Sequence, residues 1–248
     1  MSKYAIILDT EGYSNKGSYN IGYTVVDFDN FQIVKKESIA ILPYLWDNLK
    51  EKLRRNLESE NGYLSTMYLN NAEDILMNSN KKYKLIKTEL GLYKHFLLLF
   101  KKYDISDFFA FNVAFDRGAL KRSLKEKHYD KLFSNMNFHD IQTAVFYTFC
   151  NNLEYVKFCL ANNYLTKRGY CQCKAETFYR YISKEISFNE EHTALADAII
   201  ETEMLIKALQ ENPHVSTEII KPYSVLSQLY DKDDPETVFA LISDYLFE

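Results

Sequence analysis

Four acidic residues and one histidine, spread over most of the chain, are the side chains best suited to chemistry. The run YAIILDTEG places Asp9 and Glu11 two residues apart, and FNVAFDRGAL carries Asp116. Further along, EEHTALADAIIE places His192 five residues before Asp197. Carboxylates bind hard divalent cations, and histidine moves protons near neutral pH. Whether they act together depends on the elements that carry them.

The first two acids follow a buried strand. The apolar run YAIIL is typical of a buried strand, and side chains alternate across a strand. Asp9 and Glu11 therefore point to one face, where they repel each other unless a cation such as Mg²⁺ or Mn²⁺ lies between them. The alternative interpretation ends the strand at Leu8 and leaves both acids as solvated turn residues. Gly12 would then permit a tight backbone approach, for a turn or a ligand.

Asp116 stands at the start of a predicted helix. The aromatic run ISDFFAFN predicts a second buried strand, and AFDRGALKRSLKEK after it has helical composition. A carboxylate in the first turn of a helix is favoured by the macrodipole alone. This position is therefore compatible with a metal ligand or with a simple helix-start acid.

His192 and Asp197 open the clearest predicted helix, which is HTALADAIIETEMLIKAL. Thr193 is a suitable N-cap. A gap of five residues within one helix would turn the two side chains apart, so we expect His192 in the preceding loop and Asp197 in the second turn. Alanines on both sides of Asp197 suit a packed helix face. The alternative is a surface histidine and a solvated aspartate.

In this order, D-T-E-G, N-x-x-F-D-x-x-x-L and H-T-A-x-x-D-A resemble the three exonuclease motifs of the DEDDh 3'-5' exonuclease family. That family includes polymerase proofreading exonucleases and the ribonuclease T type. All five signature positions are filled, and the match covers roughly the first 210 residues. The resemblance implies an RNase H-like fold, two divalent metal ions, Mg²⁺ or Mn²⁺, and release of nucleoside monophosphates from a 3' end.

The same resemblance implies a role for each of the five residues. Asp9 would contact both metal ions. Glu11 and Asp197 would help to hold the ion that binds the attacking water, and Asp116 would hold the ion on the leaving-group side. Two cations about 4 Å apart stabilise the charge on the attacking and leaving oxygens of a phosphodiester. His192 would act as the general base.

Four further residues are candidate substrate contacts by resemblance. The backbone of Thr10 and Gly12 and the side chain of Tyr13 lie where relatives hold the terminal nucleotide, and Tyr13 could stack on a base. Asn112 precedes F-D in the second motif and would fix the strand end or contact substrate. An ordinary loop tyrosine is an equally good interpretation of Tyr13 in a chain with 20 tyrosines.

The predicted fold class is α/β. We expect an RNase H-like mixed five-stranded sheet, three antiparallel strands plus two parallel strands, flanked by helices and followed by a C-terminal helical extension. The antiparallel strands comprise the first strand and a hairpin around Asp29 and Asn30. The parallel strands are expected near Phe108–Phe111 and Asn137–His139, with Asp140 as an N-cap of the next helix.

We expect two domains. Residues 1–210 form the exonuclease domain, with a mostly helical segment at 44–104 that is partly an insertion. Residues 211–248 form a helical extension in which Pro235 starts an amphipathic helix. This extension could dock a polymerase or replication partner or a second copy of the chain.

Composition sets further limits. The net charge is −4, so a phosphate ligand needs cations or local lysines such as the cluster Lys81, Lys82, Lys84 and Lys87, or the cluster Lys121, Arg122, Lys125 and Lys127. The alternative for each cluster is a solvated helix face. No secretory signal and no apolar stretch of membrane-spanning length is present, and four cysteines without zinc-ligand spacing suggest reduced thiols. We expect a cytoplasmic protein with no membrane contact.

The sequence therefore predicts a metal-dependent 3'-5' exonuclease acting on the 3' ends of single-stranded DNA or RNA. Two alternatives stay open, which are a non-catalytic partner-binding module of a replication complex on the same fold and an RNase H-like endonuclease. No motif chooses between DNA and RNA.

Overall fold

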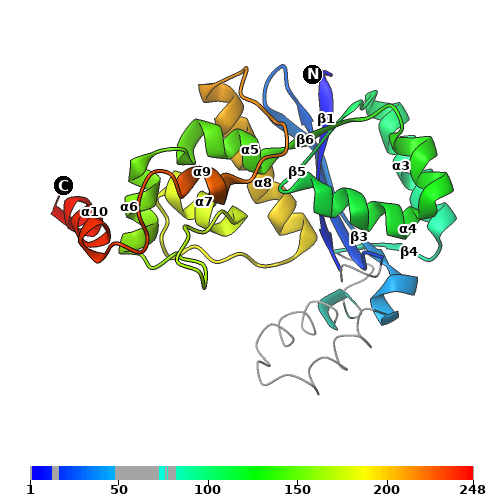
Figure 1. The fold of residues 1–248 in the computed structure, drawn as a ribbon. Coiled ribbons are helices and arrows are strands. Elements are labelled where there is room, and N and C mark those ends of the chain that lie inside the picture. The colour runs from blue at the N-terminus through cyan, green and yellow to red at the C-terminus, as the bar shows by residue number, and fades with distance from the viewer. Residues whose placement is uncertain (1, 13–16, 48–72, 76, 78–81, 248) are drawn as a thin grey trace. The chain divides into compact units, whose positions relative to one another are not determined.

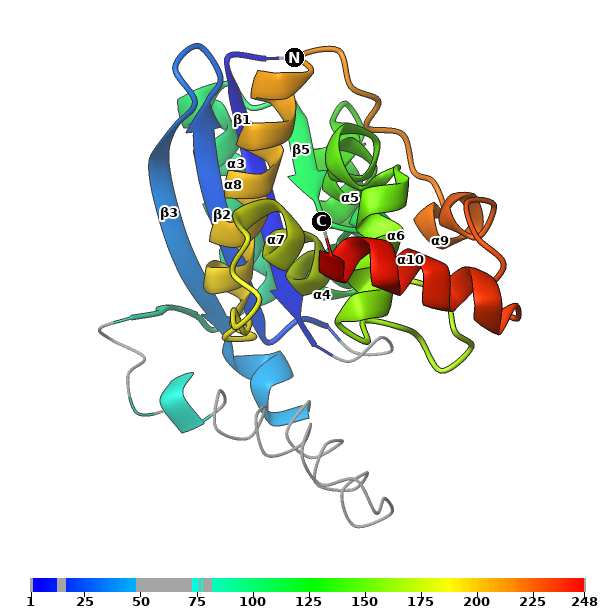
Figure 2. The same ribbon diagram turned by 90° about the vertical axis from the view of Figure 1, so that its left-hand side faces the viewer.

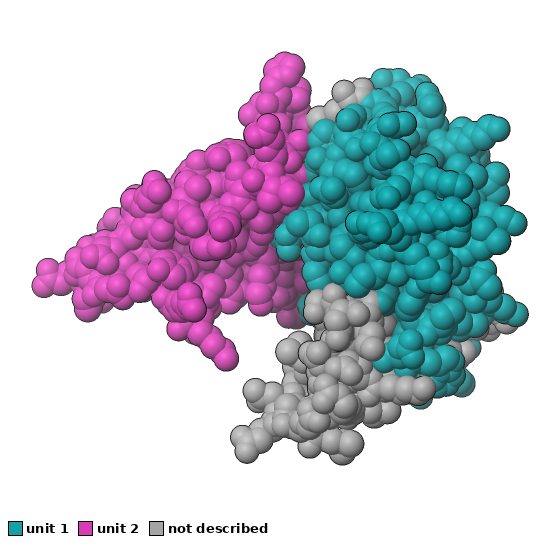
Figure 3. Space-filling model, turned by 45° about the vertical axis from the view of Figure 1, so that its right-hand side comes forward, with its two compact units in different colours: residues 1–139, 191–202 teal, residues 140–190, 203–248 magenta. Residues whose placement is uncertain are grey.

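A computed structural model describes residues 2–12, 17–47, 73–75, 77 and 82–247 of the chain (Figure 1). These residues form two compact units, which Figure 3 draws in teal and magenta. The first unit contains residues 1–139 and 191–202, and the second contains residues 140–190 and 203–248. The expected division at residue 210 stays a prediction.

A six-stranded mixed sheet is the framework of the first unit. Its strands lie in the order β4-β3-β2-β1-β5-β6. β1 pairs antiparallel with β2 and parallel with β5, and β2 pairs antiparallel with β3. This mixed sheet with flanking helices confirms the predicted RNase H-like class and the predicted hairpin. The strands are β1 (Tyr4–Glu11), β2 (Asn20–Asp27), β3 (Gln32–Ile41), β4 (Lys84–Ile86), β5 (Asp107–Ala110) and β6 (Asn137–Asp140).

The sheet has one strand more than the five that were predicted. β4 pairs parallel with the outer edge of β3 and buries Ile86. The pattern missed it because three residues are too few to show a strand period, and their pairing partner lies far away in sequence. β4 falls within the segment 44–104, which was expected to be mostly helical. Residues 48–72, 76 and 78–81 of that segment lie outside the described residues.

Two helices cover one face of this sheet, α3 (Glu89–Tyr103) and α4 (Val113–Phe133). Ile6 and Leu8 of β1 belong to one buried cluster with Phe96 of α3 and Leu120 of α4. Because side chains alternate along β1, Ile7, Asp9 and Glu11 must point to the opposite face. The first half of α8 (Ala194–Glu211) lies there, as Figure 2 shows.

The second unit is helical. It contains α5 (Ile141–Val145), the π-helical segment η1 (Phe146–Cys150), α6 (Leu153–Ala161), α7 (Ala175–Ser183), α9 (Pro222–Leu226) and α10 (Pro235–Phe247). The Asp140 side chain accepts a hydrogen bond from the backbone of Gln142, which confirms it as an N-cap. α10 begins at Pro235 as predicted and packs on α6. Among the described residues, no helix has both the length and the apolar character needed to cross a bilayer.

Candidate metal centre

Asp9 and Glu11 are part of β1 itself. The strand continues to Glu11, so the alternative in which it ends at Leu8 is wrong. Asp9 pairs with Gly22 and Glu11 pairs with Asn20 on the antiparallel neighbour β2. The two carboxylates therefore lie at the end of a paired strand, on the face away from α3 and α4, as their spacing predicted.

The first turn of α8 brings Asp197 to the same place. Thr193 caps the helix, since its carbonyl oxygen accepts from the Asp197 amide at 3.0 Å and its hydroxyl accepts from the Ala196 amide at 3.4 Å. Asp197 is the fourth residue of α8 and lies in the first turn, so its predicted place in the second turn is wrong. One oxygen from each of Asp9, Glu11 and Asp197 lies within 4.8 Å of the other two.

The start of α8 is fixed against β2 by small and polar residues. A Cβ atom at Gly22 would lie 2.0 Å from the carbonyl carbon of Ala194, so only glycine allows this approach. The Asn20 side chain accepts a hydrogen bond from the Ala194 amide at 3.2 Å. Farther along, the hydroxyls of Thr24 and Thr202 lie 2.6 Å apart. These contacts set the position of Asp197 relative to the strand, and the sequence patterns did not reveal them.

Asp116 is buried near the strand end, with 2% of its surface exposed. It is the fourth residue of α4, and its carboxylate accepts a hydrogen bond from the Thr10 hydroxyl at 2.8 Å. Burial, and then the charge of Asp9, raise the pKa of Asp116 well above its usual range. Within the described residues, Asp116 is not part of the three-carboxylate group, although it is near enough to Asp9 for the charges to interact.

Glu201 is a fifth acid that the motif search did not assign. It follows Asp197 by one helical turn on α8 and is 4% exposed. Its carboxylate accepts a hydrogen bond from the Phe111 amide at 3.2 Å. Burial and the charges of Asp9, Asp116 and Asp197, in that order, raise the pKa of Glu201 well above its usual range. The spacing of four residues from Asp197 was the only available signal.

Three further predicted residues occupy loops and corners of the first unit. His192 lies in the loop two residues before α8, as expected, with a positive φ of 52°. Asn112 is the N-cap residue of α4 and turns the chain from β5 into that helix with a φ of 60°. A Cβ at Gly12 would lie 3.1 Å from the Cα of Ser18, so the chain passes close there. Tyr13 lies outside the described residues.

The three-carboxylate group fits a small divalent cation by its chemistry. Oxygens that share one Mg²⁺ at about 2.1 Å lie at most about 4.2 Å apart. The oxygens of Asp9, Glu11 and Asp197 all lie within 4.8 Å of one another, which is close to this limit. Burial, and then the charges of the neighbouring acids, raise the pKa values of Asp116 and Glu201, and a cation would relieve the repulsion between the charges. Hard oxygen donors of this kind favour Mg²⁺ or Mn²⁺ over softer metals.

Comparisons with known proteins give little further identification. No family model matches the chain, and no match was found among curated proteins. Among solved structures, the chain is similar to E. coli Exonuclease I in complex with a dT13 oligonucleotide, with 12% sequence identity and a TM-score of 0.46. The similarity covers 86% of this chain and 42% of that one, so this chain spans less than half the length of Exonuclease I. At this identity and TM-score, the likeness does not identify the function of this chain.

Proposed function

We propose that this chain is a metal-dependent 3'-5' exonuclease that releases nucleoside monophosphates from single-stranded DNA or RNA. The observation that carries this proposal is the meeting of Asp9, Glu11 and Asp197 within 4.8 Å on one face of the sheet. Asp116 and Glu201 add two buried carboxyl groups near the same strand end. A protein does not gain stability from such a concentration of acids unless cations compensate for it.

Each residue has a defined task in this proposal. Asp9, Glu11 and Asp197 hold divalent cations, which when bound stabilise negative charge on the attacking and leaving oxygens of the phosphodiester. Asp116, oriented by the Thr10 hydroxyl, completes the acidic set on the leaving-group side. His192 takes the proton from the attacking water. His192 immediately precedes Thr193, which caps α8, so it lies close to the helical turn that carries Asp197.

The substrate contacts belong to the same proposal. Gly12 and Thr10 offer backbone groups at the end of β1, where the terminal nucleotide would lie beside the acids. Asn112 turns the chain between β5 and α4, close in sequence to Asp116. A contact to the 2'-hydroxyl would distinguish ribose from deoxyribose, and none is assigned in this proposal, so both DNA and RNA belong to the proposed substrate class.

A nuclease assay tests the proposal. Single strands with a labelled 5' end are incubated with the protein and Mg²⁺ or Mn²⁺, and with EDTA. We expect stepwise shortening with either ion, none with EDTA, and none on strands with a blocked 3' end. Asp9→Asn should lower the rate by at least about a hundredfold, since the ligand contributes several kcal/mol of charge stabilisation. Asp29→Asn is the matched control, because the Asp29 side chain is exposed and forms an ion pair with Lys3.

Other outcomes separate the alternative functions. Cleavage of circular single strands, which have no 3' end, would show that the protein is an RNase H-like endonuclease and not an exonuclease. If Mn²⁺ binds to the protein but no strand is cleaved, the protein is a non-catalytic partner-binding module and not an exonuclease. Equal rates for the wild type and Asp9→Asn would remove the acidic cluster from the mechanism.

A further inference from the structure

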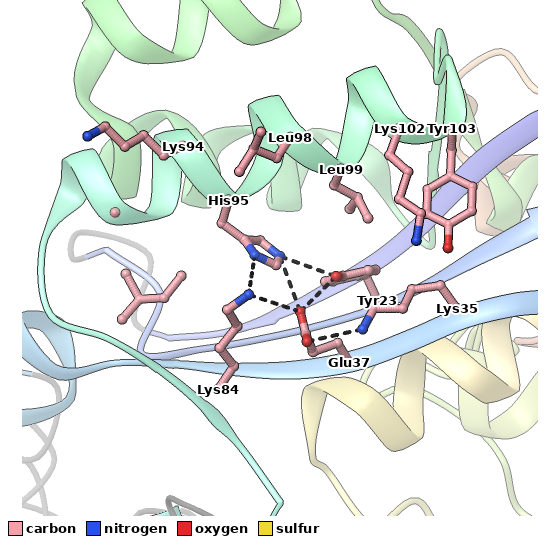
Figure 4. A pocket seen from close by; sticks show the side chains of 12 residues that line it. Tyr23, Lys35, Glu37, Lys84, Lys94, His95, Leu98, Leu99, Lys102 and Tyr103 are labelled. Carbon is pink, nitrogen blue, oxygen red and sulfur yellow. Dashed lines mark hydrogen bonds and ion pairs between the residues drawn. The ribbon is translucent and has the colours of Figure 1, made fainter.

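A second polar cluster lies on the opposite face of the same sheet, between α3 and strands β2, β3 and β4. It lines a pocket of about 440 Å³ (Figure 4). Tyr23 and Glu37 are a cross-strand pair, and Tyr23 belongs to the buried cluster beneath α3. The acids Asp9 and Glu11 point to the other face, so this pocket is not part of the candidate metal centre.

The centre of the pocket is a closed hydrogen-bond network. The Glu37 carboxylate accepts from the Tyr23 hydroxyl at 2.8 Å and from Lys35 Nζ at 3.2 Å, and it lies 3.3 Å from His95 Nε2. On the other side of the ring, Lys84 Nζ lies 2.9 Å from His95 Nδ1. Burial, and then the charge of Lys84, lower the pKa of His95 to about 4. The imidazole is therefore neutral at pH 7, with Nδ1 accepting from Lys84 and Nε2–H donating to the Tyr23 hydroxyl at 3.2 Å.

This network leaves the pocket strongly positive. Four lysines line it, namely Lys35, Lys84, Lys94 and Lys102, against the single carboxylate of Glu37. With His95 neutral, the lining carries a net charge of three positive units. The four lysines come from three different elements, namely β3, β4 and α3, and their summed charge attracts an anion.

Three lysines of the two lysine-rich stretches that lie outside the pocket form ion pairs with carboxylates. Lys121 forms an ion pair with Glu126 at 2.8 Å, and Lys125 forms one with Glu89 at 3.0 Å. Lys82 lies 3.2 Å from Asp74. In contrast, Lys84 contacts a neutral imidazole and is 4.0 Å from a carboxylate that already has other partners. The expected solvated helix face is wrong for Lys84, which lies in β4.

The remaining wall is apolar and aromatic. Ile86 of β4, Leu98 and Leu99 of α3, and the ring of Tyr103 line the space beside the lysines. Figure 4 shows Lys102 and Tyr103 at the same end of α3, beside Lys35. A single inorganic anion would leave this wall uncovered. A flat ring attached to an anion would use both parts of the pocket, because aromatic and aliphatic side chains are the usual partners of a base.

We propose that this pocket is a nucleotide-binding site, with the phosphate beside Lys35 and Lys102 and the base against Leu98 and Tyr103. Its volume lies within the usual range of about 300–1,000 Å³ for small-molecule sites. The nucleotide is either a free monophosphate or one unit of a nucleic-acid strand. The proposal does not rest on the hydrolytic activity, because none of its residues belongs to the candidate metal centre.

Calorimetric titration of an Asp9→Asn protein in EDTA tests the site. Without a cation, the acidic residues repel phosphate, so binding reports on the basic pocket. The ligands are thymidine monophosphate, a short oligothymidylate with a blocked 3' end, thymidine and inorganic phosphate. We expect saturable binding of the monophosphate, the oligomer or both, with thymidine and inorganic phosphate weaker. Lys102→Gln should weaken binding about five- to tenfold, the effect of one charged hydrogen bond.

Lys101→Gln is the matched control, because it removes the same charge from the neighbouring exposed position of α3 without touching the pocket. We expect it to change affinity by less than about twofold. Tighter binding of the monophosphate identifies a free nucleotide as the ligand, and tighter binding of the oligomer identifies a strand. The proposal is overturned if neither binds, if thymidine or inorganic phosphate binds as tightly, or if the Lys101 and Lys102 variants lose affinity equally.

Discussion

At the scale of single residues, the candidate centre is a set of acids that oppose one another. Asp116 and Glu201 are almost fully buried, and their pKa values are raised by burial and by the charge of Asp9. A buried carboxylate without compensation costs several kcal/mol. The acids therefore weaken the metal-free protein, and under the proposed function they become favourable when a cation binds. Function and stability oppose each other at these positions.

His192 provides the first prediction at this scale. A general base contributes about 10²- to 10⁴-fold to a proton-transfer step. We expect His192→Ala to lower the rate of nucleotide release by about that factor while Mn²⁺ affinity stays unchanged, since His192 is not part of the three-carboxylate group. Single-turnover assays and Mn²⁺ titration would measure the two effects. A variant with full activity would show that another group takes the proton.

Glu201 provides the second prediction at this scale. Glu201→Gln removes a buried ionisable group and keeps an oxygen acceptor for the Phe111 amide. Since the folded-state pKa is raised, the metal-free wild type loses stability as the pH rises above the usual range of a glutamate. We expect the variant in EDTA at pH 7 to be more stable by about 1 kcal/mol or more, a rise in Tm of about 2–4 °C.

The control for this experiment is Glu203→Gln, an exposed acid on the same helix. We expect its Tm to change by less than that of Glu201→Gln, because an exposed charge is solvated. A lower Tm for Glu201→Gln in EDTA would mean that the ionised carboxylate stabilises the fold.

At the scale of secondary-structure elements, the position of α8 on β2 decides whether the acids meet. Gly22 faces the backbone of Ala194 so closely that a methyl group there must displace the helix. Overpacking of this kind costs about 1–3 kcal/mol or more, and a shift of about 1 Å at a catalytic group costs about a hundredfold in rate. We expect Gly22→Ala to lower both Tm and activity.

Gly118→Ala is the matched control. A Cβ at Gly118 meets only the end of the Arg122 side chain, at 3.2 Å, and alanine is favoured over glycine inside a helix. We expect this variant to be neutral or slightly more stable. If Gly22→Ala unfolds at the same temperature as Gly118→Ala and keeps its activity, the close approach of α8 is not needed.

The contact between β5 and β6 provides a pH-dependent prediction. Asp107 is buried and accepts hydrogen bonds from the Ser2 amide, from His139 Nε2 at 2.8 Å and from Asn137 Nδ2 at 3.2 Å. Burial opposes ionisation, but these hydrogen bonds outweigh it and lower the pKa of Asp107 to about 2. Its contribution to stability, about 2 kcal/mol, is therefore present above about pH 4 and is lost as the pH falls toward 2.

Urea unfolding of Asp107→Asn would measure this effect. We expect the variant to be less stable than the wild type by about 2 kcal/mol at pH 7, and the difference to narrow below pH 4. Asp104→Asn, at the exposed C-cap of α3, should show no such narrowing. A difference for Asp107→Asn that stays constant with pH would contradict the lowered pKa.

Local signals explain which elements could be predicted. The alternation in β1, the Thr193 and Asp140 caps and the hairpin of β2 and β3 are each set by neighbouring residues, so the sequence reveals them. Glu201 and Gly22 acquire their roles through contacts with residues far away in sequence, at Phe111 and Ala194. The same is true of β4, which is a strand only because β3 is beside it. Such long-range contacts leave no local periodicity.

At the scale of the whole molecule, the candidate chemistry is confined to the first compact unit. That unit is discontinuous in sequence, because residues 191–202 return to it after the helical second unit begins. His192, Asp197 and Glu201 are all within this returning segment. The division explains how motifs at opposite ends of the chain contribute to one centre, and it leaves the role of the extension at 211–248 as a prediction.

Calorimetric titration with Mn²⁺ tests most directly whether the acids of the first unit form a divalent-cation site. The account predicts saturable Mn²⁺ binding by the wild type and by the control Asp29→Asn, and at least about tenfold weaker binding by Asp9→Asn and Asp197→Asn. Absence of Mn²⁺ binding by the wild type, or equal affinity in all four proteins, would contradict it.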